Sequence, residues 1–216
     1  MRNKFREPIS GALHLVSAIL AVLGLAVLLI QGRGNSLKEV SLLIYGLSLI
    51  LMFSSSTIYH SINTTPSSLI RLRKLDHSSI YLLIAGSYTP ICLYFFTGFW
   101  RWGFLSIIWA FGLAGIIIKL FVINAPRWVT AGIYLVMGWL SIFAIKEMIA
   151  TMPIGALIWM LAGGLFFTLG AVIYITKKMD FYPNVFGFHE VWHTFVTLGA
   201  LCHFILISAY IAAGVV

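Results

Sequence analysis

The chain has 216 residues, of which 61% are hydrophobic and only 9% are charged. Because so little polar surface cannot cover a water-soluble globule, the composition predicts a protein that resides in a lipid bilayer. The formal net charge of +8 comes without a long run of basic residues, which argues against nucleic acid as a partner and for attraction to anionic headgroups. Membrane lipids are the expected partners, and the oligomeric state stays open.

Seven apolar stretches are long enough to cross the hydrocarbon core, which needs about 20 residues of helix. In chain order they are 9–31, 40–62, 75–97, 102–121, 128–146, 153–175 and 188–212. The short segments between them carry most of the charge and the turn-forming residues, so no soluble domain fits there. The sequence therefore predicts a single domain over residues 1–216, an all-α integral membrane protein built as a seven-transmembrane helix bundle.

The orientation of this bundle follows from Lys and Arg, which favour the cytoplasmic side when they lie in short loops. Ten of them lie at the N-terminus and near the second, fourth and sixth loops. The opposite side holds four, Arg33, Lys38, Arg101 and Lys146. We therefore expect a cytoplasmic N-terminus and, after an odd number of spans, a C-terminus outside. The first span is too long for a secretory signal peptide and lacks its small-residue cleavage site, so we expect it to be retained.

Ionisable side chains within the spans are few, and they gather at the predicted cytoplasmic end. Each one costs on the order of 3 kcal/mol or more in the membrane, so each raises a functional question. The second span ends at His60, the third begins with Asp76, and the seventh begins with His189. The first span brings Glu7 and His14 in from the same side.

The spacing of these residues predicts a metal site. His189 and His193 are four residues apart, so they share one helix face and can bind one ion, as is common at zinc sites. His60 would supply a third nitrogen, and three nitrogens with one open position are typical of catalytic Zn²⁺. Asp76 and Ser56, which lies one turn before His60, are the predicted catalytic residues that would hold and polarise a water molecule.

Structural interpretations of the same residues stay open. The histidine pair could be solvated or hydrogen-bonded to neighbouring backbone. Asp76 could interact with the helix dipole or pair with Lys74 or Arg73. His203 lies ten residues beyond His193, about 15 Å along a helix, which is too far to bind the same ion. We expect His203 to be structural.

Several long stretches of the chain resemble the hemolysin III family, the bacterial branch of the progestin and adipoQ receptor superfamily. They are SSSTIYHS at 54–61, KLDHSSIYLLIAGSYTP at 74–90, LVMGWL at 135–140 and FHEVWHTFVTLGALCHF at 188–204. The resemblance implies a seven-helix protein of the bacterial inner (plasma) membrane with zinc near its cytoplasmic face. It also implies that His60, His189 and His193 are the ligands. Asp76 and Ser56 match a motif shared with alkaline ceramidases.

The first span departs from the family pattern. Relatives often carry an Asn and a Thr ahead of a histidine, whereas this chain reads Ile9-Ser10-Gly11-Ala12-Leu13-His14. Glu7 and His14 still fit the pattern, but their roles stay open, as do those of His77 and Glu190.

If the ion is zinc with one exchangeable water, it lowers the pKa of that water towards 7, and Asp76 would act as general base. The substrate would be a lipid amide or ester that reaches the site from the bilayer. We therefore expect hydrolase-like activity on lipids and a role in membrane lipid homeostasis. The main alternative is a non-catalytic zinc site, closed by Asp76 or another ligand, in a membrane sensor or scaffold.

Two further classes are less well supported by the sequence. The family name suggests a cytolysin or channel, but the fourth to sixth spans hold little charge with which to line a water-filled path. Residues 189–193 also fit the HExxH pattern of zinc proteases, in which Glu190 would be the general base. Such a short pattern arises easily by chance.

Overall fold

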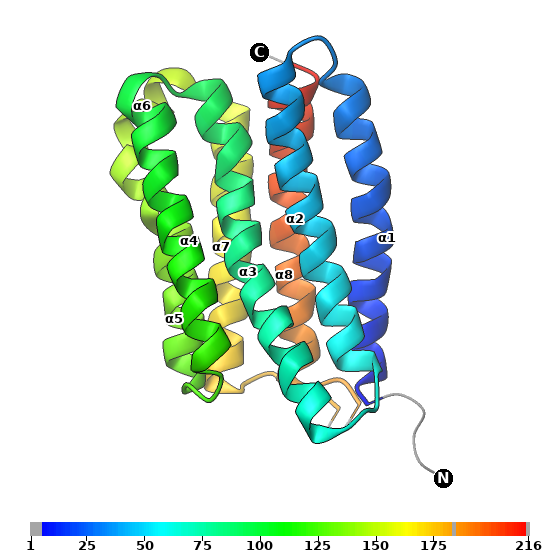
Figure 1. Cartoon of the computed structure of the whole chain (residues 1–216). Coiled ribbons are helices and arrows are strands. Elements are labelled where there is room, and N and C mark those ends of the chain that lie inside the picture. The colour runs from blue at the N-terminus through cyan, green and yellow to red at the C-terminus, as the bar shows by residue number, and fades with distance from the viewer. Residues whose placement is uncertain (1–5, 183–184, 215–216) are drawn as a thin grey trace.

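The computed structural model describes residues 6–182 and 185–214, and these residues contain seven helices long and apolar enough to cross a membrane (Figure 1). The elements are α1 (Pro8–Gln31), α2 (Ser36–Ser61), α3 (Pro66–Phe95), the π-helical turn η1 (Trp100–Phe104) with α4 (Leu105–Phe121), α5 (Arg127–Gly138), the 3₁₀ segment η2 (Trp139–Ala144), α6 (Ile145–Thr151), α7 (Ile154–Thr176), α8 (Phe188–Leu206) and the π-helical segment η3 (Ile207–Ala212). The predicted all-α, seven-span membrane bundle is confirmed.

Two helices begin earlier than the apolar stretches at 40 and 75 predict. Before α2, the Asn35 side chain accepts a hydrogen bond from the backbone N–H of Lys38, at 3.0 Å. Before α3, Thr65 caps the helix and Pro66 occupies its first turn, where the missing N–H of proline has no consequence. The first turns of both helices are polar, so hydropathy alone does not detect them.

The fifth span is a broken helix, whereas the apolar stretch at 128–146 predicts a continuous one. It consists of α5, η2 and α6, so its helical hydrogen bonding changes after Gly138. The hydroxyl of Tyr88 from α3 donates to the Gly138 carbonyl at 2.6 Å and accepts from the Ser141 N–H at 2.9 Å. Irregular backbone at membrane depth is tolerated where protein groups satisfy it in this way.

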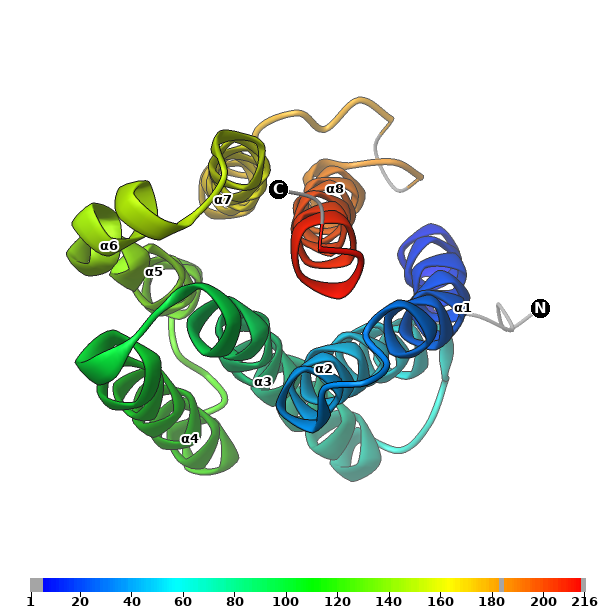
Figure 2. The ribbon, with the colours of Figure 1, turned by 90° about the horizontal axis from the view of Figure 1, so that it is seen from above.

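Seen from above, α8 lies inside an arc formed by the other spans (Figure 2). It packs mainly against α7 and also against α1, while α2 packs against α1 and α3. Small residues allow these close approaches. For example, a Cβ atom at Gly11 of α1 would collide with Ser61 at the end of α2.

The start of α1, the end of α2, the start of α3 and the start of α8 meet at one end of the bundle (Figure 1). This end carries the ionisable residues singled out from the sequence. The remaining height of the bundle is mainly apolar, and large hydrophobic side chains such as Leu20, Phe143 and Ile154 are exposed on its outside.

We expect this end to face the cytoplasm, because the basic residues concentrate on it. Alkaline phosphatase fused to the C-terminus should then be active in a bacterial host, whereas the same reporter inserted between α2 and α3 should be inactive. The reverse pattern of reporter activity would overturn the orientation.

Tyr88→Phe should lower stability by about 1–3 kcal/mol, because the two backbone groups at the break in the fifth span lose their partner. Thermal unfolding of the detergent-purified protein measures the change. Tyr94→Phe is the control, since the Tyr94 side chain is exposed, and it should leave the melting temperature nearly unchanged.

Candidate metal centre

Three histidines from two helices converge at the polar end of the bundle. His60 lies in the last turn of α2, and His189 and His193 lie in the first two turns of α8. One nitrogen from each ring lies within 4.8 Å of the others, close enough to hold a metal ion. His60 and His193 are 2% and 1% exposed, and His189 is partly buried. The sequence-based expectation that these side chains meet is confirmed.

The nitrogen atoms of this cluster suit a metal ion. Nε2 of His193 is buried and has no hydrogen-bond partner within residues 6–182 and 185–214. A buried polar nitrogen without a partner is costly, whereas coordination to a cation would satisfy it. His60 uses Nδ1 to contact Glu7, which leaves its Nε2 for an ion. Three imidazole nitrogens suit zinc, among other transition metals.

Glu7, immediately before α1, contacts two of the three histidines. Its Oε2 lies 2.6 Å from His60 Nδ1 and 3.5 Å from His189 Nδ1, and Arg6 lies 3.2 Å from its other oxygen. Burial alone would raise the pKa of Glu7, but the hydrogen bond with His60 and the charges of His60, His189 and Arg6 outweigh it. The pKa of Glu7 is therefore lowered, and it is a carboxylate at neutral pH.

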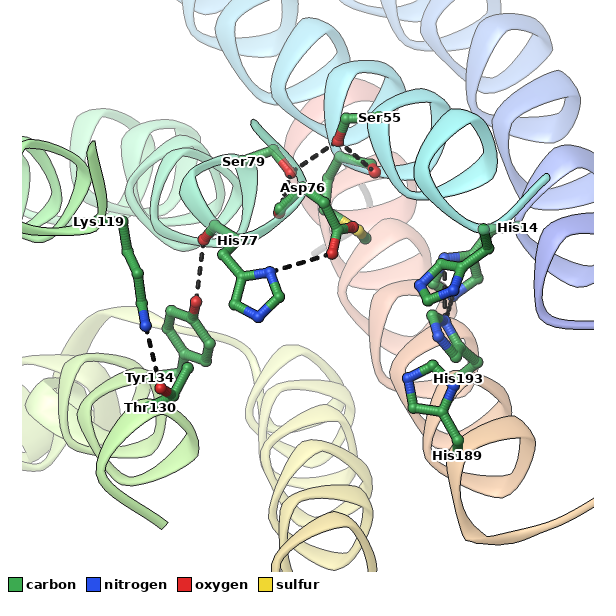
Figure 3. Close-up of polar contacts among 12 residues, drawn as sticks. His14, Ser55, Asp76, His77, Ser79, Lys119, Thr130, Tyr134, His189 and His193 are labelled. Atoms are coloured by element: carbon green, nitrogen blue, oxygen red, sulfur yellow. Dashed lines mark hydrogen bonds and ion pairs between the residues drawn. The ribbon is translucent and has the colours of Figure 1, made fainter. Parts of the chain in front are cut away.

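His14, two turns into α1, contacts the third histidine. Its ring nitrogen lies 2.7 Å from Nδ1 of His193, and the two rings meet edge to face (Figure 3). The sequence placed Glu7 and His14 at this end of the bundle but could not assign their contacts. Their separation of seven residues puts both on one face of a helix, so the sequence could have grouped them but could not have named the residues that they contact.

Glu190 has a structural role. Its Oε1 accepts a hydrogen bond from Ser10 at 2.8 Å, and its Oε2 accepts one from the backbone N–H of Gly187, which caps α8, at 3.0 Å. Both carboxylate oxygens are therefore engaged, and Glu190 fixes the start of α8 against α1. This geometry argues against the zinc-protease interpretation, in which Glu190 would serve as a general base.

Asp76 and Ser56 are both buried and line one cavity together with His193. Asp76 Oδ2 lies 3.2 Å from Nδ1 of His77 (Figure 3), and among the described residues His77 is the one basic side chain within ion-pair distance of it. Of the two basic residues weighed from the sequence, Lys74 instead donates to the carbonyl of Leu120.

Ser55, the neighbour of Ser56 in the chain, has a structural role. Its hydroxyl lies 2.9 Å from that of Ser79, which links α2 to α3. Ser79 also donates to the backbone carbonyl of Asp76 at 2.7 Å. These bonds fix α3 at Ser79 beside α2 at Ser55, and so hold Asp76 near Ser56.

The cavity extends from this polar end through the bundle interior. Its volume is about 330 Å³, and its polar end is formed by His14, Ser56, Asp76, His77 and His193. Most of the other lining residues are apolar, including Met148 and Leu157 from α6 and α7 at the opposite end. His203 also lines the wall, away from the histidine cluster. The cavity therefore combines one polar end with mainly apolar walls.

Comparison with known proteins identifies the family. A profile described as "Haemolysin-III related" matches residues 2–204. The chain belongs to the haemolysin III family. It is 35% identical over 208 residues to a "Hemolysin-3 homolog" of Bacillus subtilis (strain 168), covering 95% of this chain and 94% of that relative. It is 36% identical over 214 residues to "Hemolysin-3" of Bacillus cereus, covering 98% and 94%.

A more distant relative of this haemolysin III protein is the "Adiponectin receptor protein" of Drosophila melanogaster. The two are 26% identical over 211 residues, which cover 88% of this chain and 47% of the receptor. The resemblance inferred from the sequence motifs is confirmed. With seven spans and bacterial relatives along nearly its whole length, the chain is a multi-pass protein of the bacterial cell membrane.

Substitution of His60, His189 or His193 by Ala should each remove the bound metal, because two imidazoles hold an ion far less tightly than three. Metal content is measured by mass spectrometry of detergent-purified protein that has not met a nickel column. His203→Ala is the matched control and should retain about one metal ion per chain. If all four variants retained about one metal ion per chain, the three histidines would not be the metal ligands.

Proposed function

We propose that this haemolysin III protein is a zinc-dependent hydrolase that cleaves an amide or ester bond in a membrane lipid, and so serves membrane lipid homeostasis. One observation carries the proposal. His193 of the histidine cluster, Asp76 and Ser56 all line the polar end of one cavity whose walls are otherwise mainly apolar. A hydrolase of lipids needs this combination, because the scissile bond of its substrate lies between a polar headgroup and an apolar chain.

His60, His189 and His193 would hold the ion. Bound zinc would supply Lewis acidity and acidify a water ligand. Asp76 is the group that would accept a proton at Oδ2, because it is buried in the cavity wall and paired with His77, which could carry the proton onward. The Ser56 hydroxyl, on the same wall, would hydrogen-bond the substrate carbonyl or the water.

The apolar part of the cavity would bind the acyl chain and exclude bulk water from the polar end. Burial of each methylene group of such a chain is worth about 0.8 kcal/mol, so a long chain would supply much of the binding free energy. That binding would place the amide or ester carbonyl beside His193, where the polar residues of the wall are concentrated. Soluble polar substrates would lack this contribution.

A non-catalytic metal in a sensor or scaffold is the second candidate. The packing of α1, α2 and α8 is an observation that supports it. The three histidines come from α2 and α8, which pack together less than α1 packs against either. An ion shared by α2 and α8 would therefore link two spans that are otherwise joined mainly through α1. In this case Asp76 would stabilise the site without transferring a proton.

The names of the two Bacillus relatives refer to haemolysis. Lysis of cells by this chain would require either a pore or a change in membrane lipids. The mainly apolar interior of the cavity makes a water-filled path unfavourable. We therefore propose that any haemolysis would be an indirect result of lipid turnover.

Asp76→Asn separates the two main candidates. The amide cannot accept the proton, so hydrolysis of a long-chain lipid amide or ester should fall by roughly 10²- to 10⁴-fold while zinc remains bound. Turnover is followed by release of labelled fatty acid from lipids in mixed micelles. Ser54→Ala is a control on the same segment. Full turnover in Asp76→Asn, or none in the wild type with zinc bound, would contradict a hydrolase that uses Asp76.

A further inference from the structure

Polar residues form a line that begins immediately before α1 and continues along one face of it. This helix contributes no histidine to the cluster of three. The line consists of Glu7, Ser10, His14 and Ser17, and their spacing of three, four and three residues keeps them on one side of the helix. We call this set the α1 stripe. Its members reach α8, and Glu7 also reaches α2.

We propose that two members of the α1 stripe, Glu7 and His14, are the positioning shell of the metal centre, with Glu7 orienting His60 and His189, and His14 orienting His193. The inference rests on the proposed metal site and goes beyond it, because it assigns a function to a span that supplies no ligand. In proteins that bind metals through histidine, the second ring nitrogen is held by an acceptor, which fixes the tautomer and the ring orientation.

Glu7 meets this requirement for His60 with a hydrogen bond, and it lies within ion-pair distance of His189. Its carboxylate lies 2.6 Å from His60 Nδ1 and 3.5 Å from His189 Nδ1. A carboxylate can only accept hydrogen bonds, so the proton of each neutral ring is drawn to Nδ1 and the lone pair of Nε2 is left for the ion. The backbone N–H of Glu7 donates to the His60 carbonyl at 2.9 Å, which fixes this acceptor relative to α2.

His14 meets the requirement for the third ligand. Nδ1 of His193 faces a nitrogen of His14 at 2.7 Å, and Nε2 of His193 has no hydrogen-bond partner among the described residues. If His14 donated, the proton of neutral His193 would lie on Nε2 and would block coordination. Metal binding therefore requires His14 to accept, with its own proton on the other nitrogen. The ring is held edge to face against Phe53, at a centroid distance of 5.1 Å.

The stripe also supplies its own controls. Ser10 bonds to Glu190, and Ser17 lies 3.3 Å from the hydroxyl of Thr197. Among the described residues, neither serine hydrogen-bonds to a histidine of the cluster. Ser17→Ala therefore alters the same interface between α1 and α8 without touching a ligand, and it separates positioning of the metal site from helix packing.

The test is zinc affinity, measured by competition with a chelator on the detergent-purified full chain. Glu7→Ala and His14→Ala should each weaken zinc binding by roughly 10- to 100-fold, the loss found when acceptors behind metal-binding histidines are removed. Glu7→Gln and His14→Gln keep an acceptor oxygen and should recover part of the affinity. Ser17→Ala should bind zinc like the wild type.

Cobalt absorption gives a second readout that packing alone would not change. With saturating Co²⁺, Glu7→Gln and His14→Gln should shift the ligand-field bands, because the rings rotate while the ligands stay the same, whereas Ser17→Ala should not. These Gln variants also decide the matter if the Ala variants do not fold.

The outcomes distinguish the two levels of the proposal. If the His60→Ala, His189→Ala, His193→Ala triple variant still bound zinc, the assignment of the metal site would be wrong. The positioning shell, which depends on that site, would be wrong as well. The second outcome is that the triple variant loses zinc, while the Glu7 and His14 variants bind it like the wild type and leave the cobalt bands unshifted. This result would overturn the positioning shell and leave the proposed function standing.

Discussion

Within a bilayer, a buried polar group must find its partner inside the protein, because lipid offers none. This constraint explains the two least regular features of the bundle. The break in the fifth span persists because the Tyr88 hydroxyl satisfies the backbone of Gly138 and Ser141. The polar end persists because its side chains pair with one another across α1, α2, α3 and α8. The rest of the structure can then be apolar.

The same constraint gives the histidine cluster its chemical meaning. Among the described residues, several buried polar atoms at that end lack a hydrogen-bond partner, including Nδ1 of His77 and the Ser78 hydroxyl, and Nε2 of His193 is the one that belongs to the histidine cluster. In lipid surroundings such an atom is unfavourable unless a further group binds it, and a cation held by three imidazoles would do so. Glu7 and His14 contact Nδ1 of His60 and Nδ1 of His193, which leaves Nε2 of each ring for such a cation.

The cavity joins this polar end to the apolar interior. Asp76 and His193 lie at one end of a space that continues towards Met148 and Leu157. A molecule that fills it needs a polar head and an apolar chain, which describes a membrane lipid better than a soluble metabolite. The cavity lies within a membrane bundle, its walls are mainly apolar, and its polar residues lie at one end. Each of these three properties favours a membrane lipid as the ligand.

The sequence by itself determined the spans and the depth of the polar residues, because hydropathy is a local property and a helix rises by a fixed 1.5 Å per residue. That was enough to place His60 level with His189 and to pair His189 with His193. It could not determine how each helix is rotated, or which helices are neighbours. The contacts of Glu7 with His60, 53 residues away, and of His14 with His193, 179 residues away, exist only once α1 packs beside α2 and α8. Packing between helices decided them, because in lipid that packing depends on shape and polar pairing and not on hydrophobicity.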